Sequence, residues 1–391
     1  MNRIFKGSLA GILLVTLAVT FFASPALALP PDPDNAALLY YQGFLSLAQL
    51  EEMAWDHISS VARGKTVPDD KTREYIGKCA GAIQFAEAAS QVPTCHWGVQ
   101  YSRGFDALMP QMPQTRRLTF VLLCDARIRA ADGDYKGALE RCLLTKTLAH
   151  HVGDDTIISY LVSIAVHELT YKRVQEIISR VTGEADLLKW LKKELLTSPD
   201  KDLSLIRPLK IEMEIMADLM RIENVEQMAR VMMGEFDREK ANKIIKENNA
   251  EILEQAKRIY SERMNSALTV LSKPMPYEQA YTRLNQLAGG FDKDDPASRT
   301  AGAFMPALGK ILLLKTRAET QSNAVMAGIE ILLDRAKTGQ LADTLPKGLQ
   351  KDTFSGKDFE YEKTKDGFIL RCPGKDLDKD EINQYEFKLS K

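Results

Sequence analysis

Residues 130–139 read Ala130-Ala131-Asp132-Gly133-Asp134-Tyr135-Lys136-Gly137-Ala138-Leu139, and they mark the point where one helix turns back on the next. Helical patterns run into it from Arg116 and continue beyond it to His151. The pair Gly133-Asp134 is a tight break, which returns the second helix antiparallel to the first. Residues 116–151 therefore predict an αα-hairpin.

The same stretch resembles the turn of a tetratricopeptide repeat (TPR). In that turn a Gly closes the bend, an aromatic residue packs beneath it, and a small Ala lets the two helices approach closely. The match covers one hairpin of about 34 residues, and no clear copies recur at that spacing. The resemblance implies a TPR-like αα-hairpin within an irregular helical bundle or solenoid.

Outward from the hairpin, most of the chain also predicts helix. The expected helices cover 35–63, 69–89, 157–181, 187–271 with breaks near Pro199 and Pro208, and 277–287. Apolar residues then step by three or four from Leu308 to Ala336, which predicts one long helix that ends near Gly339. The expected fold class is mainly α.

The C-terminal region changes to the two-residue period of β-strands. Phe359 to Glu362 and Phe368 to Arg371 alternate in this way, and Lys365-Asp366-Gly367 between them is a hairpin turn signal. Tyr385 to Leu389 predicts a third strand. Because so small a sheet cannot hold a core alone, we expect an antiparallel β module packed on the long helix.

This module resembles the tail of type II secretion pseudopilins. The resemblance lies in Leu345-Pro346, in Lys351-Asp352-Thr353-Phe354-Ser355-Gly356-Lys357-Asp358-Phe359-Glu360-Tyr361, and in Asp366-Gly367-Phe368-Ile369-Leu370. Thr353 stands where the family has Pro, and the N-terminal processing motif of a pilin is missing. The resemblance therefore covers the module alone.

The order of parts along the chain is similar to that of uncharacterised exported proteins common in planctomycetes and related bacteria. The points of similarity are Asn35-Ala36-Ala37-Leu38-Leu39-Tyr40-Tyr41, Cys95-His96-Trp97-Gly98, the Gly-Asp-Tyr hairpin and the β module. This similarity implies no activity.

Residues 1–28 predict a secretory signal peptide. Arg3 and Lys6 precede an apolar core from Ser8 to Ala23, and small residues follow in Ala26-Leu27-Ala28. The core is shorter than the about 20 residues of a bilayer span, although an uncleaved anchor is the alternative. We therefore expect an exported protein, periplasmic or extracellular, with a helical domain over 29–290 and the long helix and β module over 300–391.

The charge balance argues against nucleic acid as a partner. The chain has 52 basic and 53 acidic residues, and nucleic-acid binding requires a strongly basic face. No second long apolar run follows the signal segment, so no membrane span is expected after its cleavage.

Asp376, Asp378 and Asp380 are the candidate metal ligands. Alternating carboxylates in a loop suit Ca²⁺, which takes oxygen ligands, and the pseudopilin-like tail implies a comparable loop. An EF-hand is excluded because Glu381 and Phe387 stand at its sixth and twelfth positions. A solvated acidic loop is the alternative, and no other cofactor is expected.

The cysteines offer two candidate disulfides. Cys124 and Cys142 lie nine residues either side of Gly133, so the hairpin places them at the same height. Helix rotation decides whether they face each other, and small core residues are the alternative. Cys79 and Cys95 form the second candidate pair.

Other chemistries lack a required residue. His167-Glu168-Leu169-Thr170-Tyr171 has Tyr where a zinc protease needs its second His. His150 and His151 point about 100° apart on a helix, so they do not converge on one ion with Asp154 and Asp155. The Met-rich stretch from Met213 to Met233 is best read as core packing.

The leading hypothesis is a non-catalytic helical scaffold that binds protein partners in the cell envelope. It rests on the TPR-like hairpin and on the missing catalytic motifs. One alternative is an α-helical hydrolase or lyase whose site assembles only in the fold. The other is an accessory component of a secretion or pilus-like assembly.

Overall fold

The computed structural model describes residues 32–153, 155–181, 183–197, 203–233, 246 and 249–389, except for the side chains of 105 and 231–233. The chain divides into two compact units, Met1–Asp34 and Asn35–Lys391. The signal peptide predicted over 1–28 lies outside the described residues. All that follows concerns the second unit.

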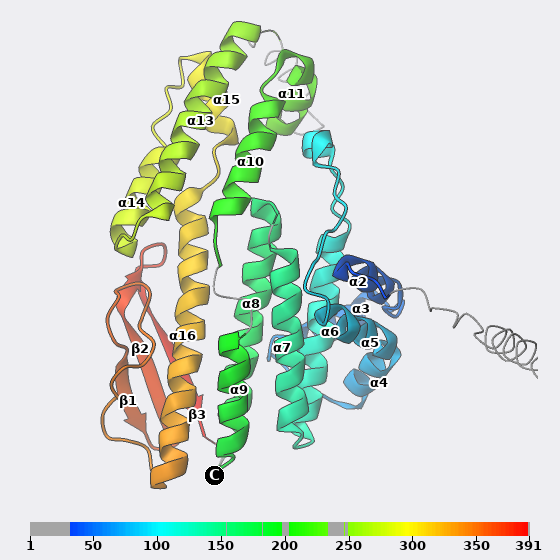
Figure 1. The fold of residues 1–391 in the computed structure, drawn as a ribbon, viewed down its shortest axis with the longest axis vertical. Helices are drawn as coiled ribbons and strands as arrows, with labels where there is room; N and C mark the ends of the chain where they lie inside the picture. The colour runs from blue at the N-terminus through cyan, green and yellow to red at the C-terminus, as the bar shows by residue number, and fades with distance from the viewer. Residues whose placement is uncertain are drawn as a thin grey trace, which may run out of the picture. The chain divides into compact units, whose positions relative to one another are not determined.

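The predicted fold class is confirmed: the described residues form mainly α-helices, followed by a small antiparallel sheet at the C-terminus (Figure 1). The helices before and in the hairpin are α2 (Ala36–Leu45), α3 (Glu52–Ala62), α4 (Asp70–Lys78), α5 (Ala80–Ser90), the 3₁₀-helix η1 (Tyr101–Asp106), α6 (Gln111–Ala131) and α7 (Tyr135–Val152). Those that follow are α8 (Ile157–Ile178), α9 (Ala185–Thr197), α10 (Ile206–Leu219), η2 (Ile222–Asn224), α11 (Val225–Met233), α13 (Ala250–Ser272), α14 (Tyr277–Ala288), α15 (Pro296–Phe304) and α16 (Leu308–Thr338).

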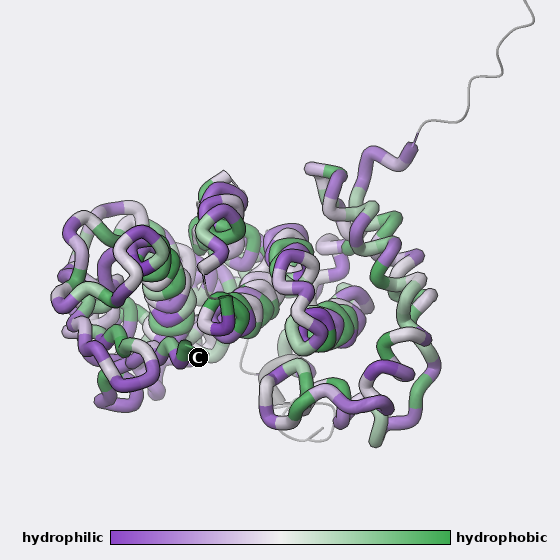
Figure 2. Tube along the Cα trace, turned by 90° about the horizontal axis from the view of Figure 1, so that it is seen from below, coloured by the Kyte–Doolittle hydropathy of each residue, from purple (hydrophilic) through white to green (hydrophobic). Residues whose placement is uncertain are grey.

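The helix expected over 35–63 is two helices, α2 and α3, and the one expected over 69–89 breaks at Cys79 into α4 and α5. These breaks let neighbouring helices pack on different partners, since α2 packs on α5 while α3 and α4 pack on α6. Apolar and polar residues are interspersed along the helices (Figure 2), and the central helices α6, α7 and α8 bury most of their residues.

The αα-hairpin is formed by α6 and α7, which pack along each other. Gly133 takes a φ of +84°, a conformation that only glycine adopts at little cost. Asp134 then caps α7 by accepting the Gly137 N–H at 2.9 Å, and a Cβ at Gly137 would collide with that carboxylate. The hairpin continues into α8, which packs on α7.

The Cys-His-Trp-Gly loop fastens α2 to the end of α7. The Asn35 side chain accepts the His96 N–H and donates to the His96 carbonyl, at 2.9 and 3.0 Å. Trp97 Nε1 donates to the His151 carbonyl at 2.8 Å, and the Tyr40 hydroxyl is hydrogen-bonded to His151 Nδ1 at 3.1 Å. These residues therefore have a structural explanation.

Two buried arginines hold the C-terminal end of α3. Arg127 of α6 donates to the Val61 carbonyl at 2.8 Å, and Arg173 of α8 donates to the Ala62 carbonyl at 2.7 Å. The last carbonyls of a helix lack intrahelical partners and form the negative end of its dipole, so guanidinium groups stabilise them. Glu176 pairs with both guanidinium groups.

The C-terminal sheet consists of β1 (Glu360–Thr364), β2 (Gly367–Asp376) and β3 (Glu381–Lys388), antiparallel and in that order. Phe368 lies opposite Phe387, and their rings stack at 4.6 Å between centroids. α16 meets β3 at Gly328, where a Cβ would stand 2.5 Å from the Phe387 ring. The sheet therefore packs on the long helix, as expected.

A buried carboxylate organises the segment that leads into the sheet. Asp352 accepts hydrogen bonds from the N–H groups of Phe354, Ser355 and Gly374 at 3.0, 3.1 and 2.9 Å. It also accepts the Ser355 hydroxyl at 2.6 Å. A side chain at Gly374 would stand 2.5 Å from Phe354, so only glycine fits beside this turn.

None of the described helices combines the length and the apolar character that crossing a membrane requires.

Candidate functional site

The predicted calcium ligands lie at the β2–β3 turn, and each carboxylate has a cationic partner. Asp376 pairs with Arg317 at 2.5 Å, Asp378 with Lys310 and also with Arg317, and Asp380 with Lys375 at 2.9 Å. Burial raises the pKa of Asp376, but its hydrogen bonds to Arg317 and to backbone N–H groups outweigh this and hold the pKa below its usual value. Within the described residues no three His, Cys, Asp or Glu side chains form a metal-binding group. The Ca²⁺ site stays a prediction.

The four cysteines of the candidate disulfides are free thiols in the structure: Cys79, Cys95, Cys124 and Cys142. The Cys124 thiol donates to the Ile58 carbonyl at 3.5 Å. The positive charge of Arg173 lowers the pKa of both Cys124 and Cys142, but burial has the larger effect. Burial raises the pKa of each of these two thiols to about 12, which disfavours the reactive thiolate. Both disulfide pairings stay predictions.

His151 and three methionines of the Met-rich stretch take part in packing. Burial lowers the pKa of His151 to about 4, and its ring bonds to Tyr40. Asp155 accepts the Tyr101 hydroxyl at 2.8 Å, whereas Asp154 lies outside the described residues. Met216, Met220 and Met228 are buried in the apolar core.

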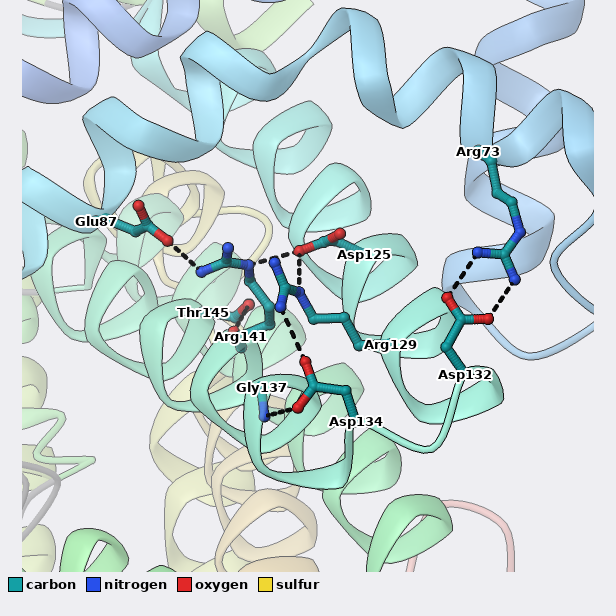
Figure 3. Close-up of polar contacts among 9 residues, drawn as sticks. All are labelled: Arg73, Glu87, Asp125, Arg129, Asp132, Asp134, Gly137, Arg141 and Thr145. Atoms are coloured by element: carbon teal, nitrogen blue, oxygen red, sulfur yellow. Dashed lines mark hydrogen bonds and ion pairs between the residues drawn. The ribbon is translucent and has the colours of Figure 1, made fainter.

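An ion-pair network joins the αα-hairpin to α4 and α5 (Figure 3). Every guanidinium group drawn there has a carboxylate partner: Arg141 pairs with Glu87 and Asp125, Arg129 with Asp125 and Asp134, and Arg73 with Asp132 through two bonds of 2.7 Å. The donors of this network are therefore used within the chain, which indicates a structural role.

A groove of about 520 Å³ between α3 and α6 has a different character. We call it the Trp55 groove; its lining is Leu50, Glu52, Trp55, Asp56 and Ser59 on one side, and Pro113, Arg116, Arg117 and Phe120 on the other. From Glu52 to Ser59 and from Pro113 to Phe120 these residues follow the spacing i, i+3, i+4, i+7, which places each set on one face of its helix. One helix therefore supplies each wall.

Arginines stack on the aromatic rings of the Trp55 groove. The Arg117 guanidinium carbon lies 5.1 Å from the centre of the Trp55 ring. Those of Arg63 and Arg116 lie 5.1 and 5.6 Å from the centre of the Phe120 ring. In contrast to the network at the hairpin, neither Arg116 nor Arg117 is paired with a carboxylate among the described residues. The ring contacts leave their N–H groups available.

A second hollow, the His167 cavity, has a volume of about 490 Å³. It is lined by His167, Tyr171, Leu195, Leu196, Leu203, Glu319, Ser322, Asn323, Met326, Gln350 and Thr353. The His167 ring stacks on Tyr171 at 4.4 Å, and burial lowers the pKa of His167 to about 3. Burial also lowers the pKa of neighbouring Lys146 to about 8.

No protein-family model, curated protein or solved structure matches this chain. The function must therefore be argued from the residues themselves. Neither hollow was expected from the sequence. The only local sign of the Trp55 groove is the helical spacing of Arg116, Arg117 and Phe120, whose partner wall lies some 60 residues earlier.

Proposed function

We propose that the protein is an exported, non-catalytic helical scaffold that binds a protein partner through the Trp55 groove. The observation that carries this proposal is the groove lining, in which Trp55 and two exposed arginines flank an aromatic ring. Trp and Arg are enriched among the few residues that supply most of the binding energy at protein interfaces. Export follows from the predicted signal peptide over 1–28.

The groove is also built on the αα-hairpin, because α6 provides one wall. Stacking on Trp55 limits the motion of Arg117 before a partner arrives, which reduces the entropy lost on binding. A surface formed by two helix faces suits an extended protein segment or a helix.

Affinity capture from the native envelope tests the proposal with two matched variants. Trp55→Ala removes the groove aromatic. Trp190→Ala removes another half-buried Trp, on α9, that also stacks on a cation. We expect partners captured by the wild type to be lost with Trp55→Ala and kept with Trp190→Ala. Capture of the same partners by both variants, or of none by the wild type, would contradict the proposal.

A second candidate, an α-helical hydrolase or lyase, has the His167 cavity in its favour. Its volume lies within the range of small-molecule sites, and titratable groups line it. A pKa of about 3 makes His167 a weak base at neutral pH, because general bases work best near the operating pH. Lys146, with a pKa of about 8, is better matched, but it is buried and does not line the cavity itself.

Turnover screening with Lys146→Met and His167→Phe tests this second candidate. A substrate that the wild type converts, and that either variant fails to convert, would favour the hydrolase or lyase hypothesis. An activity that both variants retain would remove the cavity from consideration.

A further inference from the structure

We infer that the Trp55 groove accepts an amphipathic helix that carries acidic side chains along one flank and basic side chains along the other. This inference rests on the proposed function and names the class of partner segment. It follows from the way in which opposite charges are separated between the two walls.

The two walls of the groove carry opposite charge. Glu52 and Asp56 lie one turn apart on α3, and Arg116 and Arg117 lie on α6. All four side chains are exposed, and none forms an ion pair among the residues that the structure describes. Two carboxylates of α3 therefore line one side of the groove and two guanidinium groups of α6 line the other, while Arg63 at the end of α3 lies over Phe120.

The arginines of the Trp55 groove differ from several buried or networked arginines of this chain. Carboxylate partners are found for Arg73, Arg127, Arg129, Arg141, Arg173, Arg180, Arg317 and Arg371. Arg116 and Arg117 instead hold their guanidinium planes against aromatic rings, with Glu52 and Asp56 lining the same groove. Their in-plane N–H donors fit a carboxylate from outside the chain.

The charge separation selects among partner segments. Arg63 also lies over Phe120 and adds a third cation, but the two carboxylates of α3 give the groove mixed charge. A phosphate-rich or anionic membrane surface would require a uniformly basic one. A uniformly acidic segment would meet repulsion from α3, and a uniformly basic one from α6. Only a segment with both charges, one on each flank, pairs with both walls.

The apolar content of the groove supplies the remaining requirement. Leu50, Trp55 and Pro113 contribute apolar surface beside the charged groups, whereas Phe120 is almost fully buried beneath Arg63 and Arg116. An amphipathic helix carries an apolar stripe with a polar flank on each side of it. When such a helix binds in a groove, its residues at i, i+3, i+4 and i+7 make the contacts. The walls of the groove have the same spacing, so a third helix continues the packing of α3 against α6.

Two synthetic helical peptides of identical composition test the inference. The segregated peptide has a Leu stripe with Glu on one flank and Lys on the other; the mixed peptide has Glu and Lys on both flanks. We expect fluorescence anisotropy with the mature chain to show the segregated peptide binding at least about ten-fold more tightly, a difference of about 1.4 kcal/mol. Equal affinities would overturn the inference.

Charge reversal supplies the decisive comparison. The double variant Arg116→Glu/Arg117→Glu makes both walls acidic, and we expect it to lose at least about ten-fold in affinity for the segregated peptide. Adding Glu52→Lys and Asp56→Lys exchanges the two walls and restores binding, because the peptide can lie in the opposite direction. Arg283→Glu, an exposed site on α14, is the matched control and leaves binding unchanged. Failure of the exchanged walls to restore binding in a chain with wild-type thermal stability would refute charge separation as the basis of recognition.

A photo-crosslinking residue at Ser59 separates this inference from the proposed function. Envelope partners that crosslink equally well to the wild type and to the double Glu variant would uphold the scaffold and refute the inference. Selective binding of the segregated peptide without any crosslinked envelope protein would uphold the inference and count against the scaffold.

Discussion

Replacing Asp352 with Ala removes one acceptor group that serves four donors. The N–H groups of Phe354, Ser355 and Gly374 and the Ser355 hydroxyl all point at this carboxylate. A buried donor left without a partner costs about 1–3 kcal/mol. Because water can reach the half-buried Ser355, two or three donors carry the full penalty, and we expect the β module to lose about 3–5 kcal/mol.

Hydrogen exchange of the β2 amides is the appropriate assay, because it reports the stability of the module rather than that of the whole chain. Asp352→Asn keeps one carbonyl acceptor, so its effect should be smaller than that of Asp352→Ala. Asp358→Ala is the matched control, since this exposed carboxylate has no hydrogen bond in the described structure, and a change within about 0.5 kcal/mol is expected. The reasoning is refuted if the β2 amides exchange equally fast in Asp352→Ala and Asp358→Ala.

Three further predictions concern the helical body. Gly137→Ala should lower the free energy of unfolding by about 1–3 kcal/mol, because the new Cβ collides with the capping carboxylate of Asp134. Gly77→Ala, with open space around the new Cβ, should raise the free energy of unfolding by about 0.5–1 kcal/mol. Denaturant unfolding measures both changes. Thr119→Val should be neutral or stabilising, because the buried Thr119 hydroxyl has no hydrogen-bond partner. Thr145→Val should cost about 1 kcal/mol of stability, because it removes the 2.8 Å hydrogen bond to the Arg141 carbonyl. A larger loss of stability in Thr119→Val than in Thr145→Val would contradict the argument. Below pH 6.5 the unfolded chain protonates the imidazole of His151 while the folded chain does not, so stability should fall by about 3 kcal/mol between pH 6.5 and 4 and then level off. His151→Gln should flatten thermal unfolding temperatures across that range relative to the wild type.

Local sequence signals were sufficient for most of the helices, the hairpin and the β module, whereas α15 was not predicted. The turn at Gly133 and the apolar stripe of α16 depend on neighbouring residues, and both occur where expected. The breaks after α2 and at Cys79 were missed because they depend on which distant helix each segment packs against.

The Trp55 groove could not be predicted for the same physical reason. Its walls are separate stretches of sequence, and only the packing of α3 on α6 brings Trp55 beneath Arg117. The buried Arg173 that holds the end of α3 lies 111 residues from the carbonyl it binds. Periodicity locates each helix face, whereas these contacts depend on tertiary structure.

The hydrogen bonds of Arg127 and Arg173 to the end of α3 also affect how stable the groove is while the chain is being synthesised. Both walls of the groove and Arg127 are made before α8, and Arg173 of α8 then adds the second guanidinium group that binds the last turn of α3. A nascent chain that ends before Arg173 therefore contains both walls but lacks one of the two side chains that hold the end of α3. The α3 wall reaches its full stability only after α8 has been made.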